Sequence, residues 1–452
     1  MRLENFWDKL FTLYILTCFF LTTGMLLPKP VLAQTTGTAE IKQVNPAPSP
    51  RPDRIILTWQ TEPATSQTVT WRTDNSVKTP KAEIALADAS ANFTNYAKAF
   101  PADTKALKTQ NGEALYHSVN FTSLIPNTLY VYRVGDGSHW SEWFQFRTAS
   151  QQPEPFSFIY FGDAQNQIFS QWSRVIRAAY AEMPKAKFIL YAGDLVNHAE
   201  DDTEWQEWFT AGSFIHATIP SILVPGNHEY ARNAIGLPRI TRQWDPQFNL
   251  PDNGLKVQQE LVYYTDYQDV RIISLNSYWL VPAQARWLEE VLKKNPKKWT
   301  VVAFHYPLHS TAIGRENENL VKHWQPILDK YNVDLVLQGH DHTYARGTNS
   351  PAGEHNKDEK TGPVYVVSIS GPKMYTLGDK EWMQRGAENT QLYQIITVDQ
   401  DKLLYKSMTV TGELYDAFEL HKQKGSPARL TELKTDIKTE RRFDNTLKAP
   451  TR

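Results

Sequence analysis

FSFIYFGDAQ, residues 156–165, shows the pattern that organises the larger part of this chain. An apolar run of strand length ends at a polar loop that carries an acidic residue. The same change from apolar run to polar loop follows runs at 188–191, 221–224, 300–304 and 333–337. The loops carry Asp, Asn or His residues, and stretches with helical periodicity separate the runs. Buried strands that alternate with helices predict an α/β domain whose polar loops lie at the carboxyl ends of its strands.

The helical stretches expected between these strands are 170–183, 204–211, 283–294 and 319–331. Two further strand-rich segments, within 363–370 and 393–420, should complete the sheets. We therefore expect an α/β domain over 151–420, with all five polar loops at one edge of one sheet. Residues 421–452 alternate in charge and have few large apolar side chains, which predicts a loosely attached, charged C-terminal tail.

A different pattern precedes this domain. Short runs of β-branched and aromatic residues follow one another with turns, and no helical stretch, between them. They lie at 55–59, 67–72, 117–121, 129–134 and 143–147. This spacing predicts a β-sandwich of about 100 residues over 53–150. Residues 34–52, which are rich in Pro, Thr and Ala, are predicted to be a linker.

Residues 1–33 have the pattern of an export signal. Arg2 and Lys9 flank a short polar start, and a nearly unbroken apolar run follows at 10–27. Small residues stand three and one positions before Gln34, as at a cleavage site. The alternative is a retained membrane anchor, because the apolar run is close to the shortest that can span a bilayer. We predict a signal peptide, a secreted or periplasmic bacterial protein, and no stable membrane insertion after cleavage.

The composition excludes several classes of protein and of site. The chain has 452 residues, with 48 Lys and Arg against 49 Asp and Glu. This balance of charge does not imply a strongly basic surface or nucleic acid binding. Hydrophobic residues make up 41% and aromatic residues 12%, which argues against a disordered or fibrous chain. The single cysteine excludes a disulfide framework and a thiolate metal cluster. A metal would therefore need nitrogen and oxygen ligands.

Such donors follow all five strands of the α/β pattern. They are Asp163, Asp194, Asn227, His305, His340 and His342. The last two are separated by Asp341, so an extended loop directs both imidazoles to one side and this carboxylate to the other. Oxygen and imidazole donors suit Zn, Mn and Fe. One carboxylate placed between two such metals can bridge them, and the pair can deprotonate a shared water and neutralise a phosphoryl group during in-line attack.

The motifs formed by these loops resemble those of the calcineurin-like metallophosphoesterases, and among them the purple acid phosphatases most closely. They are FGDAQ (161–165), AGDLVN (192–197), PGNHE (225–229), AFHYP (303–307) and GHDHTYAR (339–346). Residues 54–73 and 132–148 are similar to the fibronectin-III-like domain that precedes the catalytic domain in that branch. The resemblance covers about residues 53–420. It implies a fibronectin-III-like β-sandwich followed by an α/β metallophosphoesterase sandwich, in which two β-sheets are flanked by helices.

The resemblance also implies a role for each donor. Asp194 would bridge the two metals, which would be divalent or mixed-valence ions of Fe, Zn or Mn. The remaining ligands would be Asp163 and His342 for the first metal, and Asn227, His305 and His340 for the second. His228 matches the histidine that contacts the phosphate and assists the leaving group, and its protonated form could donate a proton to the departing alkoxide.

Two positions depart from the family pattern. In purple acid phosphatases a tyrosine three residues after the bridging aspartate binds ferric iron and gives the colour, whereas this chain has Asn197. In the wider superfamily a histidine two residues after the first aspartate does the equivalent work, whereas this chain has Gln165. Gln165, Asn197 or water would then complete the first metal's shell, and we predict a colourless enzyme. His198 and His309 are further candidates to line the pocket, and the alternative for both is an ordinary loop residue.

Three functions are compatible with these observations. The first is a secreted, metal-dependent phosphoric ester hydrolase of the acid phosphatase kind, which cleaves small phosphate monoesters by attack of a metal-bound hydroxide. The second is a phosphodiesterase or nucleotidase that uses the same site, because two metals serve both reactions. The third is a non-catalytic binding protein, which would predict missing ligands. The oligomeric state stays open.

Overall fold

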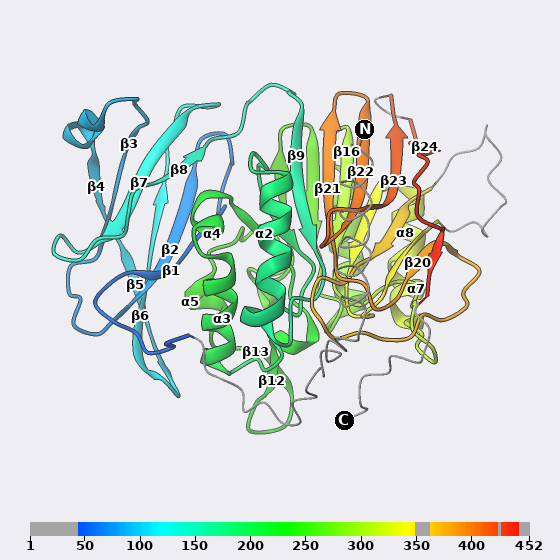
Figure 1. Ribbon diagram of the computed structural model, residues 1–452, viewed down its shortest axis with the longest axis horizontal. Helices are drawn as coiled ribbons and strands as arrows, with labels where there is room; N and C mark the ends of the chain where they lie inside the picture. The colour runs from blue at the N-terminus through cyan, green and yellow to red at the C-terminus, as the bar shows by residue number, and fades with distance from the viewer. Residues whose placement is uncertain (1–43, 349–361, 424–425, 443–452) are drawn as a thin grey trace, which may run out of the picture. The chain divides into compact units, whose positions relative to one another are not determined.

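The computed structural model describes residues 44–348, 362–423 and 426–442, and Figure 1 follows the chain in colour from blue to red. The predicted signal peptide at 1–33 and most of the predicted linker lie outside the described residues. Among the described residues, no helix has both the length and the apolar character that a membrane span requires.

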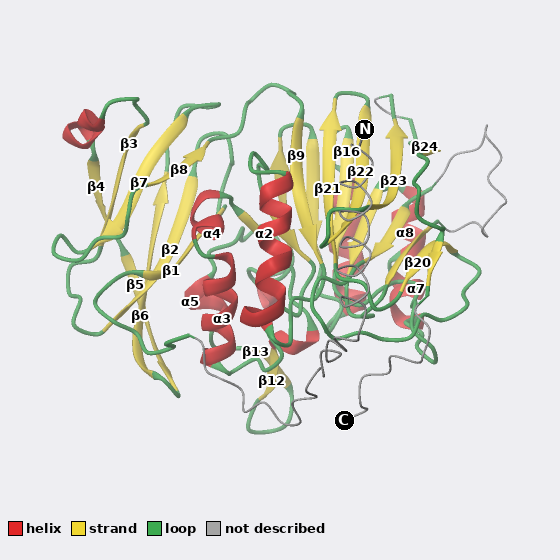
Figure 2. Cartoon of the chain, viewed as in Figure 1, coloured by secondary structure: helices red, strands yellow, loops and turns green. Residues whose placement is uncertain are grey.

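The N-terminal region is a β-sandwich of two four-stranded sheets, as predicted (Figure 2). The strand orders are β1-β2-β6-β5 and β4-β3-β7-β8. The bounds are β1 Asp53–Thr58, β2 Gln67–Asp74, β3 Lys81–Leu86, β4 Lys98–Pro101, β5 Asp103–Thr109, β6 Gly112–Phe121, β7 Leu129–Gly135 and β8 Phe144–Arg147, with a short turn η1 at Ala91–Tyr96. Trp71, Phe121 and Tyr132 are completely buried in the apolar core of this sandwich.

The α/β region contains two large sheets, as the resemblance implied. One has seven strands in the order β11-β10-β9-β21-β22-β23-β24, and the other has eight in the order β14-β15-β16-β17-β19-β18-β20-β25. The first sheet consists of β9 Phe156–Phe161, β10 Ile189–Tyr191, β11 Ser221–Leu223, β21 Leu392–Asp399, β22 Lys402–Thr409, β23 Leu414–His421 and β24 Arg429–Glu432. The second consists of β14 Tyr263–Tyr267, β15 Val270–Ser274, β16 Trp299–Ala303, β17 Leu335–Gln338, β18 Tyr344–Gly347, β19 Val364–Val367, β20 Met383–Ala387 and β25 Glu440–Arg441. A hairpin of β12 (Tyr230–Arg232) and β13 (Pro238–Ile240) lies between β11 and β14 in sequence.

Helices follow the strands as the periodicity predicts. They are α2 Ser173–Glu182, α3 Asp202–Gly212, α4 Phe214–Thr218, α5 Trp244–Gln247, α6 Val281–Lys293, α7 Glu318–His323 and α8 Gln325–Lys330, with short turns η2 Ile168–Trp172, η3 Asn227–Glu229 and η4 Lys256–Gln258. The predicted helix at 319–331 is two helices, because Pro326 stands in the first turn of α8 and cannot donate a backbone hydrogen bond to the preceding turn.

Alternate residues of the eight-stranded sheet face two different cores. Val301 and Leu335 belong to the large apolar cluster that includes the strands of the seven-stranded sheet. Their chain neighbours Val302 and Val336 belong to a second cluster, together with side chains of α6, α7 and α8. This alternation follows from the two-residue period of a strand, and it places the sheet between another sheet and a layer of helices.

The prediction that all five polar loops lie at the edge of one sheet is wrong. The loops that follow β9, β10 and β11 belong to the seven-stranded sheet, whereas those that follow β16 and β17 belong to the eight-stranded sheet. Periodicity shows that a strand is buried, but it does not show which strand lies beside it. The five loops therefore approach one another from two sheets.

The structure also differs from the predicted loose tail at 421–452. Among its described residues, β24 pairs with β23 and places Leu430 opposite Leu420, while β25 pairs with β20. Glu432 forms an ion pair with the buried guanidinium of Arg346. This part of the tail is attached because its few apolar and acidic side chains meet partners from elsewhere in the chain.

A buried histidine makes stability depend on pH. His216 on α4 is completely buried, its ring stacks on Trp208 at 4.2 Å, and burial lowers the pKa of its imidazole to about 3. An unfolded histidine titrates near 6.5, so between these values the unfolded state binds a proton that the folded state rejects. We expect the free energy of unfolding to fall as pH drops through this window, by up to about 1.4 kcal/mol per pH unit from this group.

Urea unfolding at a series of pH values checks this prediction. The variant His216→Gln should show a shallower pH slope between 6.5 and 4 than the wild type, whatever its absolute stability. His421→Gln, at an exposed position, is the matched control and should keep the wild-type slope. Equal slopes in the wild type and His216→Gln would contradict the prediction.

Candidate metal centre

The site is built from the turns that directly follow the parallel strands. Asp163 and Asp194 come two and three residues after β9 and β10, and His340 comes two residues after β17. Their φ angles are 36°, 53° and 71°, in the left-handed region that L residues rarely adopt. Asp and His tolerate this region better than β-branched residues, and surrounding contacts must hold such strain. The turns therefore aim these side chains in directions that a regular strand or helix would not allow.

Two glycines let the loops approach the carboxylates closely. A Cβ atom on Gly226 would lie 2.2 Å from Asp194 Oδ1, and one on Gly339 would lie 2.3 Å from Asp163 Oδ2. No side chain fits at such distances, so both positions need glycine. The glycines of the PGNHE and GHDH motifs thus serve packing at the site rather than chemistry.

The structure brings the predicted donors together in two overlapping groups. Asp163, Asp194 and His342 form one group, and Asp194, His305 and His340 form the other, with the donor atoms in each group within 4.8 Å of one another. Asn227 joins the second group, because its Oδ1 lies 3.1 Å from His305 Nε2. Asp194 is common to both groups.

Hydrogen bonds orient the imidazoles toward the centre. The Nδ1 of His305 donates to the carbonyl oxygen of Ala192 at 2.8 Å, and the Nδ1 of His342 donates to that of Lys373 at 2.8 Å. In the neutral form of each ring, Nε2 then carries the lone pair and points at the carboxylates: His305 Nε2 lies 3.1 Å from Asp194 Oδ2, and His342 Nε2 lies 3.6 Å from Asp163 Oδ1. This is the arrangement that metal-binding histidines adopt.

The electrostatics of the site favour a cation. Burial raises the pKa of Asp163 well above its usual value. Burial opposes the charge of His305 as well, yet the carboxylates of Asp194 and Asp163 outweigh it and raise the pKa of that imidazole to about 9. Burial lowers the pKa of His340 to about 2 and of His342 to about 3, so both rings are neutral and free to bind a metal.

One carboxylate oxygen of the site has no hydrogen-bond partner among the described residues. Asp163 Oδ1 is buried and accepts no hydrogen bond, although a buried carboxylate oxygen without a partner is unfavourable. A cation would satisfy this oxygen together with the lone pairs that face it. The donor set therefore fits two metal ions held by oxygen and nitrogen, with Asp194 between them.

His228 lies beside the donors and faces the same space. Its Nδ1 donates to the backbone carbonyl oxygen of Asn197 at 2.6 Å, which leaves Nε2 directed at the site, 3.9 Å from Asp194 Oδ2. The side chain of His228 is 26% exposed, whereas that of Asp194 is 1% exposed. A substrate can therefore reach this imidazole from solvent.

Of the four further candidates, Gln165 contacts the donors, whereas Asn197, His198 and His309 have other neighbours. Gln165 is completely buried, and its side-chain amide lies between Asp194 and His342. The amide nitrogen of Asn197 lies beside the ring of the exposed His198, whose Nδ1 contacts Glu204. His309 packs its ring against Tyr365 and Trp382.

Sequence reasoning missed Glu229. Its buried carboxylate accepts backbone N–H groups of Asp194 at 2.9 Å, Leu195 at 2.7 Å and Gly226 at 2.7 Å. These bonds tie the loop after β10 to the loop after β11, so Glu229 holds two donor loops in register. The signal was the acidic residue of the PGNHE motif, two residues after Asn227, since carboxylates near metal ligands often orient those ligands through hydrogen bonds.

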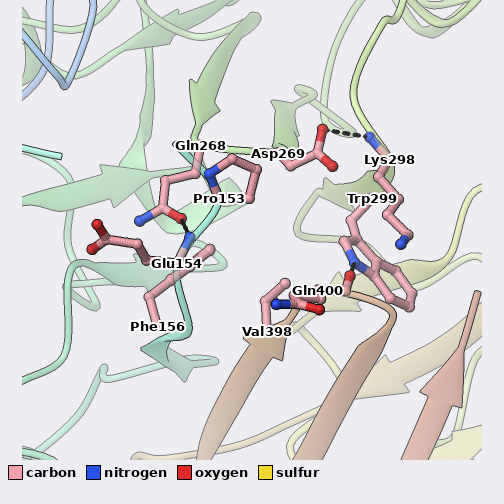
Figure 3. A pocket seen from close by; sticks show the side chains of 9 residues that line it. All are labelled: Pro153, Glu154, Phe156, Gln268, Asp269, Lys298, Trp299, Val398 and Gln400. Carbon is pink, nitrogen blue, oxygen red and sulfur yellow. Dashed lines mark hydrogen bonds between the residues drawn. The ribbon is translucent and has the colours of Figure 1, made fainter. Parts of the chain in front are cut away.

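A cavity of about 210 Å³ lies elsewhere, where strands β9 and β16 begin (Figure 3). Phe156 and Trp299, the first residues of β9 and β16, line it. Its polar groups pair with one another: Gln268 Oε1 accepts the backbone N–H of Glu154 at 2.7 Å, and the backbone N–H of Lys298 donates to Asp269 at 3.1 Å. The cavity is separate from the donor groups.

Comparisons with known proteins agree with this architecture. Residues 52–148 match the family described as purple acid phosphatase, N-terminal domain, and residues 156–344 match the family described as calcineurin-like phosphoesterase. An uncharacterized protein of Mycobacterium tuberculosis is 28% identical over a match that spans 63% of this chain and 60% of that protein, so the chain spans less than two thirds of this relative. Probable purple acid phosphatase 20 of Arabidopsis thaliana is 26% identical over 73% of this chain and 74% of its own length. The structure of purple acid phosphatase PPD1 from yellow lupin covers 82% of this chain, with 74% of its own length, at a TM-score of 0.67 and 19% identity, and shows that the fold is shared.

Proposed function

Because this chain belongs to the calcineurin-like phosphoesterases, in the branch that carries a purple acid phosphatase N-terminal domain, we propose that it is a secreted phosphatase that hydrolyses phosphate monoesters at two metal ions. The observation that carries this proposal is the shared carboxylate of Asp194, which belongs to both donor groups. When bound, two such ions activate water near neutral pH and neutralise charge on a phosphoryl group.

The residues that would hold the metals are those of the two groups. Asp163, Asp194 and His342 would hold the first ion, and Asp194, Asn227, His305 and His340 would hold the second. Glu229 keeps the loops of Asp194 and Asn227 in place through its backbone hydrogen bonds. The substrate phosphate would bind in the space that these side chains and His228 face.

His228 would assist the leaving group. The bond from Nδ1 to the carbonyl oxygen of Asn197 holds the ring in one orientation, so its imidazolium form can donate the Nε2 proton to a departing alkoxide oxygen. The proton then neutralises the leaving group as the phosphorus–oxygen bond breaks. This role needs Nε2 to face the substrate, and the position of Nε2, 3.9 Å from Asp194 Oδ2, supports it.

Hydrolysis of p-nitrophenyl phosphate beside bis-p-nitrophenyl phosphate tests the proposed reaction. The purified chain would be stripped of metal and reloaded separately with Zn, Mn and Fe, with Asp194→Ala as the inactive control. Dominant turnover of the monoester would support the phosphatase. Dominant turnover of the diester would favour a phosphodiesterase or nucleotidase, and no turnover with any metal would favour a non-catalytic binding protein.

The pattern of residues 1–33 supports export. Expression in a bacterium, followed by N-terminal sequencing of the exported fraction, should give a mature chain that begins at Gln34. A chain that keeps its first 33 residues and stays with the membrane would support the anchor instead.

We also expect the metal-loaded protein to be colourless. Asn197 stands three residues after the shared aspartate, where purple acid phosphatases have the tyrosine that colours them, and its amide nitrogen lies beside His198. An absorption spectrum of the iron-loaded protein should therefore lack the tyrosinate-to-iron band in the visible range. The variant Asn197→Tyr is an informative comparison, and a purple wild-type protein would contradict the prediction.

A further inference from the structure

We infer that the side-chain oxygen of Gln165 is the fourth protein ligand of the first metal, and that this ion is divalent. The inference rests on the proposed function, because it assumes that the two donor groups hold metals. Related sites place a tyrosine or a histidine near the first metal, whereas this chain has Asn197 and Gln165 at those two positions.

The amide of Gln165 contacts two members of the first donor group. Its Nε2 lies 2.9 Å from His342 Nε2 and 3.1 Å from Asp194 Oδ2. Both are lone-pair atoms that face the first site, since the Nδ1 of His342 is already bonded to the carbonyl oxygen of Lys373. The backbone N–H of Gln165 also donates to the carbonyl oxygen of Asp194 at 3.1 Å, which anchors the residue where the two loops meet.

The other end of this amide is unsatisfied. Gln165 Oε1 is buried and has no hydrogen-bond partner among the described residues, and the residue is 0% exposed. A half-turn about the last side-chain bond exchanges the oxygen and the nitrogen of a glutamine. With a cation in the first site, this half-turn would direct Oε1 toward the ion, as a ligand beside Asp163 Oδ1, which also lacks a hydrogen-bond partner among the described residues.

The sequence allows either Gln165 or Asn197 to be a ligand of the first metal, and the two amides have different surroundings in the structure. The amide nitrogen of Asn197 lies 3.1 Å from His198 Nε2, and its backbone N–H donates to Glu204. The side chain of His198 is 68% exposed, and among the described residues the Asn197 side chain has no hydrogen bond to a donor residue. Only Gln165 therefore provides an amide inside the first group.

The charge of this ligand set favours a divalent ion. The two groups contain two carboxylates, Asp163 and Asp194, and the second of these is shared between the metals. The carboxylate of Glu229 binds backbone N–H groups instead of facing the donors. A neutral amide in place of a phenolate leaves a negative charge of two for both ions together, so a ferric ion in the first site would be less well neutralised than a divalent ion.

Metal binding by matched variants tests this inference without measuring activity. Apo wild type, Gln165→Ala, Gln165→His and Asn197→Ala would be titrated calorimetrically with Mn²⁺ and Zn²⁺, and their metal content would be measured after dialysis. We expect two ions per wild-type chain, and in Gln165→Ala an affinity for one ion lowered by about tenfold or more. Gln165→His should restore this affinity, because an imidazole can bind in the same place, and Asn197→Ala should bind metal like the wild type.

Cobalt and iron provide a second readout. The visible absorption of the Co²⁺ form should change in Gln165→Ala, because the ion loses a ligand, and should stay unchanged in Asn197→Ala. Gln165→Glu keeps the shape of the side chain and serves if the alanine variant does not fold. Its added charge should tighten binding at one of the two sites and shift the preference of that site toward Fe³⁺.

The outcomes separate this inference from the proposed function. Unchanged metal affinity in Gln165→Ala, or an equal loss in Asn197→Ala, would overturn the ligand role while the phosphatase proposal stands. Tighter binding of Fe³⁺ than of divalent ions by the wild type would overturn the assignment of the ion. A wild-type chain that binds no metal would overturn the proposed function itself.

Discussion

Asp194→Ala should lose both metal ions and lower kcat/KM for phosphate monoesters by about 10⁴-fold or more, since each ion supplies several kcal/mol of transition-state stabilisation. The carboxylate of Asp194 is the one side chain common to the two donor groups. Its Oδ2 lies 3.1 Å from His305 Nε2, and its Oδ1 accepts the backbone N–H of His228 at 2.9 Å. Removal of this carboxylate therefore affects both metal positions and the loop that carries His228, the proposed general acid.

Two companion variants make this result interpretable. Asp194 has a φ of 53°, which asparagine tolerates better than alanine, so Asp194→Asn keeps the backbone conformation while it removes the charge. Asp379→Ala removes a carboxylate that is 95% exposed and should leave metal content and turnover at the wild-type level. Metal content per chain and steady-state kinetics would be measured on each protein. An Asp194→Ala protein that keeps one full equivalent of metal and measurable turnover would show that the two positions do not depend on a common ligand.

His228→Ala should keep both metals but lower turnover by about 10²–10⁴-fold, the size expected for the loss of a general acid. The imidazole is held by its bond to the carbonyl oxygen of Asn197 and contributes no atom to either donor group. Its removal therefore takes away a proton donor without taking away a metal ligand.

The leaving group distinguishes this role from a structural one. An alkyl phosphate has a strongly basic leaving oxygen that needs a proton, whereas the p-nitrophenolate ion leaves readily without one. His228→Ala should therefore reduce kcat far more for the alkyl phosphate than for p-nitrophenyl phosphate, at unchanged metal content. His198→Ala, at an exposed neighbouring position, is the matched control and should reduce neither rate selectively. Equal losses on both substrates, or loss of metal, would show that His228 acts by positioning the site.

The identity of the metal donors could be predicted from the sequence because their geometry is local. A residue that directly follows a buried strand lies at the carboxyl edge of its sheet, whatever the rest of the chain does. Asp163, Asp194 and His342 could therefore be named from their places after three apolar runs, and the structure brings them together. The β-sandwich could be predicted for the same reason, because strand length and turn residues are properties of short segments.

Contacts between distant segments decided which amide lies among the donors, what Glu229 binds, and which sheet each loop belongs to. Gln165 and Asn197 are both amides next to a metal loop, yet one is completely buried among the donors and the other lies beside a surface histidine. The same holds for Glu229, which acts through the backbone of a loop more than thirty residues away, and for the division of the five loops between two sheets. Sequence periodicity records which face of a segment is apolar, and so it determined the strands, the loops and the donor types. The direction of a side chain and the partner of a strand depend on which distant segments pack together, and only the tertiary structure decides that.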